Sequence, residues 1–148
     1  MKIENHVNLE FPSRYANEGF ARAAAACFAA QLDPTLEEVN DVKTAVSEAV
    51  TNAIVHAYPD TIGKIAMKLR LREDHSLEIV IRDWGVGIAD VDQARTPLFT
   101  TGTEERSGMG FTIMESFMDK LSVRSAPGKG TTVRMQKALS QRLSGSAK

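Results

Sequence analysis

The stretch Leu36–Tyr58, LEEVNDVKTAVSEAVTNAIVHAY, decides the fold of this chain. Its apolar residues recur at intervals of three and four, which places them along one face of a helix; they are Val39, Val42, Val46, Ala49, Val50, Ala53 and Ala57. Thr35 and Glu38 form a capping-box pattern at the start, and Pro59 ends the helix. We therefore predict a helix to about Tyr58 with one buried stripe.

On the N-terminal side of this helix, the sequence predicts a strand and a second helix. His6–Phe11 alternates as a short strand does, and Pro12 and Ser13 then break the pattern. An alanine-rich helix is expected from about Tyr15 to Leu32. Cys27 lies within it, where we expect a small buried hydrophobic residue.

On the C-terminal side, the pattern changes to alternation. Ile65–Leu71 and Leu77–Ile81 predict a hairpin in which each strand has one face in water. Ile88–Ser107 shows no sustained period, and a loop of that length is a candidate lid. A third helix is expected from about Gly108, followed by two strands; its buried positions would be Ile113, Met114, Phe117 and Leu121, and the strands Ser122–Ser125 and Thr131–Gln136. This order predicts an α+β, two-layer sandwich with helices on one face of a mainly antiparallel sheet.

Composition bounds the class of protein. The 148 residues suit one domain, 1–148, with a core at about 6–139 and a frayed end at 140–148. A hydrophobic fraction of 43% is that of a globular chain, and a net charge of -1 excludes a basic nucleic-acid-binding tail. Ala21–Leu32 contains Arg22 and is too short to span a membrane, and residues 1–6 lack a secretory pattern. We expect a soluble cytoplasmic protein that binds neither membrane nor nucleic acid directly.

Two features could carry chemistry with a carboxylate or an amide. Glu48 and Asn52 are four residues apart, so they share the helix face opposite the apolar stripe. That pair is ordinarily a solvated face, but it can also offer an amide oxygen for a divalent cation and a carboxylate for a proton. Asp83-Trp84-Gly85-Val86-Gly87 directly follows a predicted strand. It can be a simple turn, or Asp83 can accept hydrogen bonds from an exocyclic amino group while the glycines let the backbone approach a ring.

Two glycine-containing segments could hold phosphate or form turns. Ser107-Gly108-Met109-Gly110-Phe111 opens the third helix, where free N–H groups and the helix dipole favour an anion. Arg106 directly before it could add a charged fork. Gly128–Thr132 leads into the last strand and is most simply a turn. Each pattern is weak alone, but chance rarely assembles them in this serial order.

Together these motifs resemble the GHKL nucleotide-binding superfamily. The segments Ser47–Ile54, Pro97–Thr101 and Arg106–Glu115 are most similar to the sporulation anti-sigma kinases of endospore-forming bacteria, which are serine-protein kinases. The resemblance covers about His6 to Leu139 and implies the Bergerat ATP-binding sandwich with an ATP lid. Two positions depart from the family pattern: Trp84 replaces a small or polar residue at the rim of the adenine pocket, and Gly102 stands where a lid lysine is common.

The resemblance also implies residue roles. Glu48 would be the general base, Asn52 the Mg²⁺ ligand, Asp83 the group that reads adenine, and Arg106 a phosphate contact or transition-state finger. Other nucleotide contacts would come from residues of the glycine motifs, the lid and the last strand: Gly85, Gly87, Thr100, Thr101, Ser107, Gly108, Met109, Gly110, Phe111 and Thr131. The implied ligands are ATP or ADP with Mg²⁺.

The implied partners are a sigma factor of the sigma F type, an anti-anti-sigma protein whose serine is phosphorylated, and a second copy in a homodimer. A serine hydroxyl needs a proton acceptor, which Glu48 offers, so a serine kinase is favoured over a histidine kinase. His6, His56 and His75 are interpreted as ordinary polar residues. Glu18 and Arg22 are candidates for partner contact. An ATP-switched sigma-binding module without phosphotransfer, a histidine-kinase-like domain and a detached hydrolase remain as alternatives.

Overall fold

A computed structural model describes residues 2–95 and 110–140. It contains a five-stranded sheet with the order β1-β2-β3-β5-β4, in which every neighbouring pair is antiparallel. The strands are β1 (Ile3–Pro12), β2 (Lys64–Arg72), β3 (Ser76–Asp83), β4 (Lys120–Ala126) and β5 (Gly130–Ala138). The helices are α1 (Ala16–Ala29), α2 (Leu36–Asn52), α3 (Val91–Ala94) and α4 (Gly110–Phe117), with short turns of 3-10 and π helix at Ala30–Leu32 and Ala53–Ala57.

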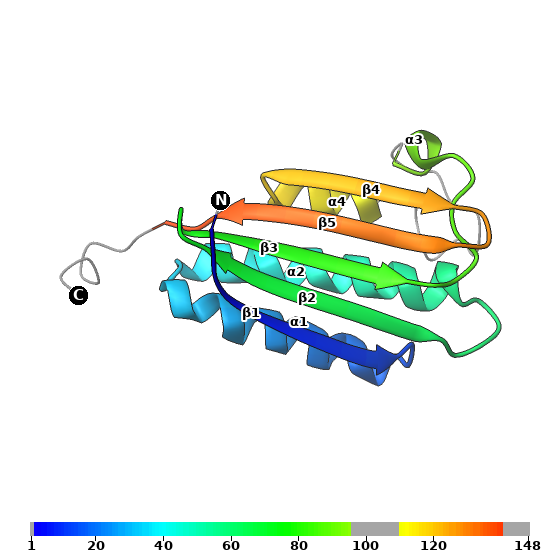
Figure 1. Ribbon diagram of the computed structural model, residues 1–148, viewed down its shortest axis with the longest axis horizontal. Helices are drawn as coiled ribbons and strands as arrows, with labels where there is room; N and C mark the ends of the chain where they lie inside the picture. Colours follow the sequence, from blue (N-terminus) through cyan, green and yellow to red (C-terminus); the bar gives the residue numbers. More distant parts are fainter. Residues whose placement is uncertain (1, 96–109, 141–148) are drawn as a thin grey trace.

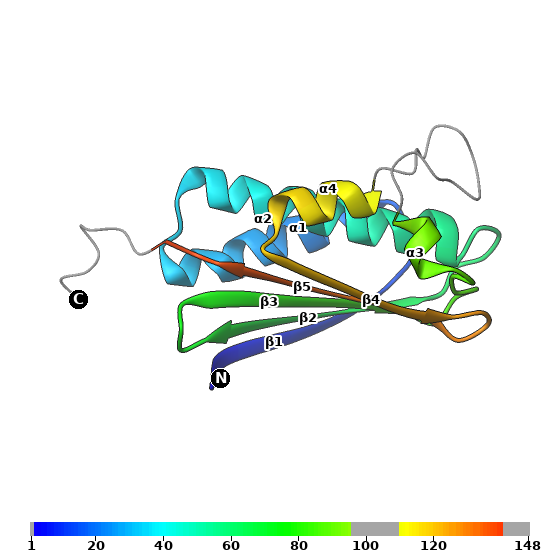
Figure 2. The same ribbon diagram turned by 90° about the horizontal axis from the view of Figure 1, so that it is seen from above.

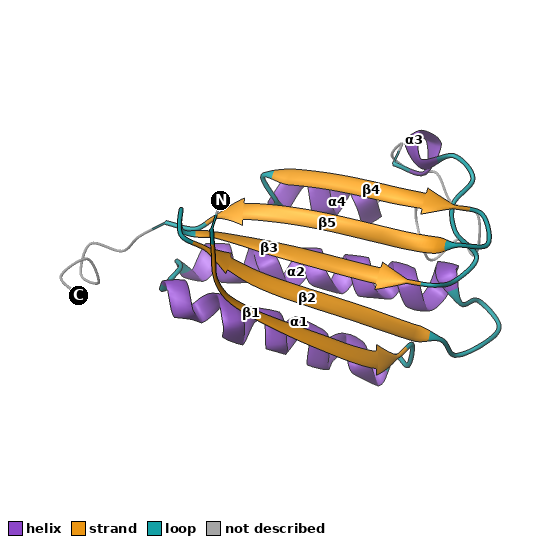
Figure 3. Cartoon of the chain, in the orientation of Figure 1, coloured by secondary structure: helices purple, strands orange, loops and turns teal. Residues whose placement is uncertain are grey.

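The helices α1, α2 and α4 cover one face of the sheet, which confirms the predicted two-layer α+β sandwich (Figures 1 and 2). Figure 3 shows the same layers by secondary structure, with α3 set at the end of the sheet toward which β3 runs. Within the part of the chain that the structure describes, no helix is both long and apolar enough to cross a membrane.

The helix α2 begins and packs as its sequence predicts. The Thr35 hydroxyl accepts a hydrogen bond from Glu38 N at 3.1 Å, and the Glu38 carboxylate accepts one from Thr35 N at 2.9 Å. The predicted apolar stripe is buried except at Val39, which is half-buried. Directly after Asn52 the helix widens into a π turn, Ala53–Ala57. Such turns concentrate at functional sites because they redirect side chains and free backbone groups.

Three predictions about single positions were wrong. Cys27 is exposed on α1, because the buried face of that helix is formed by Ala21, Ala25 and Ala29. Phe117 is 37% exposed at the end of α4, and Met118 takes the buried position next to it. Leu121 belongs to β4 rather than to the helix.

The central strand β3 is buried on both faces, which corrects the prediction that each hairpin strand keeps one face in water. Glu78 lies on the face away from the helices and is only 2% exposed. Its carboxylate forms ion pairs with Arg70 at 3.2 Å, Arg72 at 2.9 Å and Arg134 at 3.7 Å, so neighbouring strands cover it with their arginines. The charged cluster therefore replaces an apolar layer on this face.

We expect Glu78→Gln to lower the free energy of unfolding by ~1–3 kcal/mol, because the change leaves three guanidinium groups without their shared carboxylate. The effect stays below that of a fully buried pair since Arg70 and Arg134 retain contact with water. Urea unfolding measures the difference. Glu10→Gln, at an exposed position of β1, is the control and should change stability by less than about 0.5 kcal/mol. Equal stability of both variants would contradict the structural role of the cluster.

Candidate functional site

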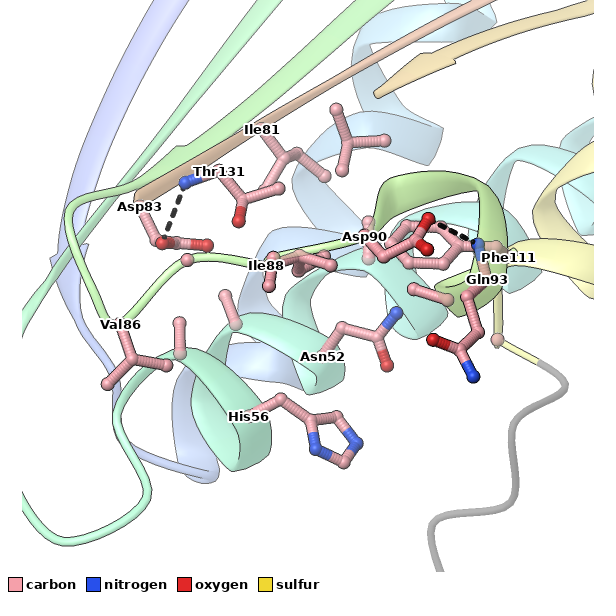
Figure 4. Close-up of a pocket in the computed structure, with 18 residues that line it drawn as sticks. Asn52, His56, Ile81, Asp83, Val86, Ile88, Asp90, Gln93, Phe111 and Thr131 are labelled. Atoms are coloured by element: carbon pink, nitrogen blue, oxygen red, sulfur yellow. Dashed lines mark hydrogen bonds between the residues drawn. The ribbon is translucent and has the colours of Figure 1, made fainter. Parts of the chain in front are cut away.

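A cavity of about 380 Å³ lies between the helical layer and the end of β3. Its lining includes Asn52, Asp83, Gly87, Gly110, Phe111 and Thr131, which come from four of the sequence motifs. In Figure 4, Asp83 and Thr131 lie at one end of the cavity and Phe111 and Gln93 at the other. The fold thus brings together residues that are up to 79 positions apart, from Asn52 to Thr131.

Asp83 is the buried carboxylate of this site, with an exposed fraction of 6%. Its Oδ1 accepts hydrogen bonds from Gly85 N at 3.0 Å and Thr131 N at 3.1 Å. Among the described residues, none donates a hydrogen bond to Oδ2. Burial raises the pKa of Asp83 above its ordinary value, although the two backbone hydrogen bonds act in the opposite direction. The site therefore presents one carboxylate oxygen to a ligand that can donate a hydrogen bond.

The two glycines after Asp83 let the loop lie close to its neighbours. A Cβ on Gly85 would come within 2.2 Å of the Ala57 carbonyl oxygen, in the π turn. Gly87 has a φ of +79°, and a Cβ there would come within 2.0 Å of the Ala126 carbonyl oxygen. Gly87 lines the cavity, whereas Gly85 does not. Next to Gly85, Val86 N donates a hydrogen bond to the Ala57 carbonyl oxygen at 3.0 Å, which ties the loop to the π turn. Glycine is therefore required at Gly85 for the close approach, and at Gly87 for both the close approach and the positive φ.

The Asn52 side chain lies beside the first residue of α4. That residue is Gly110, where an added Cβ would come within 3.0 Å of Asn52 Nδ2 and 3.1 Å of Oδ1. The glycine therefore keeps space for the amide at the start of α4. No group of three or more metal-ligating side chains occurs in residues 2–95 and 110–140. A single amide oxygen fits Mg²⁺, which takes its remaining ligands from phosphates and water.

Glu48 lies one helical turn before Asn52 but does not line this cavity. It lines a second hollow of about 410 Å³ with Arg22, Asn40, Lys43, Thr44 and Ser47. In that hollow Arg22 bonds the Glu18 carboxylate at 2.9 Å, and the Ser47 hydroxyl also donates to Glu18. The structure thus joins the candidate partner residues Glu18 and Arg22 to the helix that carries Glu48.

His56 is a lining residue that the sequence interpretation missed. It follows Asn52 by four residues and is among the lining residues labelled in Figure 4. The regular spacing of positions 48, 52 and 56 is the signal that could have identified it. Asp90 and Gln93 also line the cavity from α3, a short helix within the stretch predicted to be aperiodic; Asp90 caps it by accepting a hydrogen bond from Gln93 N at 3.0 Å.

Several predicted site residues lie outside the described residues. They are Thr100, Thr101, Arg106, Ser107, Gly108 and Met109, together with Gly102 and the other lid residues between 96 and 107. Trp84, by contrast, is described and is 39% exposed. It does not line the cavity, because its ring lies beside the cations of Lys64 and Arg82 at 4.3 and 4.7 Å from the ring centre.

Comparisons with known proteins identify relatives of this chain. A family model described as a histidine kinase-like ATPase domain matches residues 11–137. An anti-sigma F factor of Caldanaerobacter subterraneus is 56% identical over 93% of this chain and 96% of its own length. That of Bacillus subtilis is 54% identical over 94% and 96%.

Solved structures share the fold at lower identity. A Mycobacterium tuberculosis protein with RsbU and RsbW domains matches with a TM-score of 0.67 and 18% identity, covering 93% of this chain and 33% of that one. The mycobacterial sensor histidine kinase MprB matches with a TM-score of 0.58 and 15% identity, covering 93% and 100%.

Proposed function

Since the chain belongs to the anti-sigma F factors within the histidine kinase-like ATPase domain family, we propose that it is an ATP-dependent serine kinase. It binds and inhibits a sigma factor of the sigma F type, and it phosphorylates a serine of an anti-anti-sigma antagonist. It acts in the cytoplasm as a homodimer. The observation that carries this proposal is the convergence of Asp83, Asn52 and Gly110 on one cavity.

The two ends of the cavity suit the two ends of ATP. Asp83 accepts from the 6-amino group of adenine, and Gly87 lets the backbone lie along the ring. Asn52 and the N-terminus of α4 at Gly110 also line the cavity and would face the phosphates. Asn52 would hold Mg²⁺, which neutralises phosphate charge during transfer. Thr131 completes the adenine end beside Asp83.

The proposed transfer needs a base close to the phosphate end. The acceptor serine Oγ forms a bond to the γ-phosphorus, the bond from that phosphorus to the β,γ-bridging oxygen breaks, and ADP leaves. Glu48 takes the hydroxyl proton, because a carboxylate can act as the general base for a serine hydroxyl. It lies one turn before Asn52, at the hollow next to the nucleotide cavity rather than inside that cavity. The acceptor segment then enters from that hollow.

The second hollow, which Glu48 and Arg22 line, is also where we place the proposed partner contact of Glu18 and Arg22. Arg22 keeps 42% of its side chain exposed while it bonds Glu18, so its guanidinium is held in position yet remains accessible. A held cation next to the proposed base suits the docking of a partner whose serine must reach Glu48. The sigma factor and the antagonist would share this surface.

Two alternatives are separated by chemistry rather than by binding. A sigma-binding module that only switches with ATP would bind nucleotide and sigma factor but transfer no phosphate. A histidine-kinase-like domain would place the phosphate on an imidazole. The carboxylate at position 48 favours a hydroxyl acceptor over both.

The test is incubation of the purified protein with Mg²⁺, γ-labelled ATP and the small anti-anti-sigma protein of the same organism. We expect label on the antagonist that survives acid and is lost in alkali, as phosphoserine is. Acid-labile label would indicate phosphohistidine, and unlabelled antagonist with intact nucleotide binding would indicate the switch module. Either result would overturn the serine-kinase proposal.

A further inference from the structure

Ser125 stands behind the adenine end of the cavity without lining it. It lies on β4 directly opposite Thr131 of β5. Its Oγ accepts a hydrogen bond from Ile88 N at 2.7 Å, donates one to the Gly130 carbonyl oxygen at 2.9 Å, and lies 2.8 Å from Thr131 Oγ1. One hydroxyl therefore joins the loop after Gly87, the last turn and the threonine of the site.

The number of hydrogens fixes the direction of the bond between the two hydroxyls. A backbone N–H only donates and a carbonyl oxygen only accepts, so Ser125 uses its single proton on Gly130 and receives one from Ile88. The contact between Ser125 and Thr131 can then form only if Thr131 donates. The proton of Thr131 is consequently engaged by Ser125, and the Thr131 hydroxyl oxygen can only accept from a ligand in the cavity that Thr131 lines.

The side chains of Asp83 and Thr131 therefore present acceptors to the adenine end of the cavity. Asp83 offers Oδ2, because Gly85 N and Thr131 N occupy Oδ1. Thr131 adds a hydroxyl oxygen whose proton is engaged elsewhere. Adenine donates at its 6-amino group and accepts at N1, whereas a 6-oxo purine accepts at O6 and donates at N1. An acceptor that faces position 6 therefore pairs with the amino group, but it leaves two buried lone pairs facing each other when the oxo group is there.

We propose that Ser125 is a positioning residue that sets nucleotide selectivity: by accepting the Thr131 proton, it makes the site accept 6-amino purines and reject 6-oxo purines. This inference rests on the proposed nucleotide function of the cavity. Without Ser125, the Thr131 hydroxyl is free to rotate and donate to a 6-oxo group, so discrimination should weaken while the cavity keeps its shape.

The experiment compares ADP with IDP, whose bases differ at position 6 and in the proton on N1. Titration calorimetry with Mg²⁺ gives the ratio of the two dissociation constants for each variant. We expect Ser125→Ala to reduce the preference for ADP by about tenfold, the size expected for one hydrogen bond that changes direction. Ser125→Thr keeps the hydroxyl and should restore the preference. A structural role alone would weaken ADP and IDP by the same factor, which would overturn the proposal.

A double-mutant cycle tests whether Ser125 acts through Thr131. In a Thr131→Val background, Ser125→Ala should leave the ADP-to-IDP ratio unchanged, because no hydroxyl remains to redirect. A further change of the ratio there would contradict the proposed route. Absence of ADP binding in the unaltered protein would instead overturn the proposed function, so the two failures are distinguishable. If Ser125→Ala does not fold, Thr131→Val alone supplies the test: it removes the acceptor that Ser125 is proposed to orient, so the preference for ADP should fall.

Discussion

Asp83→Asn should weaken ADP binding by ~100-fold or more, corresponding to a lost interaction and an unpaired buried group. An asparagine has one acceptor and one donor group where the carboxylate has two acceptors. If its oxygen keeps the bonds from Gly85 N and Thr131 N, its NH₂ group faces the adenine amino group. If the amide turns over, its NH₂ group faces those two N–H donors instead. Neither orientation satisfies the site. Calorimetric titration with ADP and Mg²⁺ measures the loss.

The control for this change is Glu37→Gln, which removes a carboxylate from an exposed position of α2 and should leave ADP affinity within about twofold. Near-normal binding by Asp83→Asn would refute the assignment of the adenine end. A second readout is pH. Because burial raises the pKa of Asp83, and adenine needs the ionised carboxylate, affinity should fall on acidification at a higher pH than for an ordinary aspartate.

The same pKa direction fixes the effect of Asp83 on stability without nucleotide. The folded state holds the Asp83 proton more tightly than the unfolded state does. Its contribution to stability is therefore fully present below the unfolded pKa and is lost as pH rises through the folded pKa. At neutral pH the ionised Asp83 therefore lowers the free energy of unfolding. A ligand whose amino group donates a hydrogen bond to the carboxylate would offset this loss.

Local sequence predicted those parts of the fold that depend on local physics. The capping box at Thr35 and Glu38 and the apolar stripe of α2 follow from spacing within a single helix. The hairpin of β2 and β3 follows from alternation around a short turn. The sandwich itself followed from the order of these elements together with the family resemblance.

Features that depend on tertiary neighbours could not be predicted in the same way. An alternating strand does not reveal that it will be central, so the burial of Glu78 required knowledge that β2 and β5 flank β3. At the end of the π turn, the Ala57 carbonyl oxygen accepts a hydrogen bond from Val86 N, a contact between distant positions that local spacing does not reveal. Ser125 carries no motif and acquires its contacts only through the pairing of β4 with β5.

The candidate site was recognised as separate motifs before their positions were known. Asp83, Gly87, Asn52, Gly110 and Thr131 each belong to a short pattern, and the structure places all of them on one cavity. Glu48 is different: its motif shares a helix with Asn52, but the structure assigns it to the adjacent hollow. That separation is the reason to treat nucleotide binding and proton transfer as independently testable.

Glu48→Gln should reduce phosphotransfer to the antagonist by ~10²–10⁴-fold, the usual contribution of a general base. Glutamine keeps the size and hydrogen-bonding reach of the side chain but cannot accept the serine proton. ATP affinity should stay within about twofold, because Glu48 lines the second hollow and not the nucleotide cavity.

Single-turnover transfer with labelled ATP, together with calorimetry, separates these two effects. Glu37→Gln on the same helix is the matched control and should alter neither quantity. Unchanged transfer in Glu48→Gln would exclude Glu48 as the base while leaving the adenine and metal assignments intact. If both transfer and affinity fell, Glu48 would be acting through the position of Asn52 one turn away, and its role would be structural. The expected pattern, slow transfer with normal binding, arises only if the carboxylate acts on the acceptor hydroxyl itself.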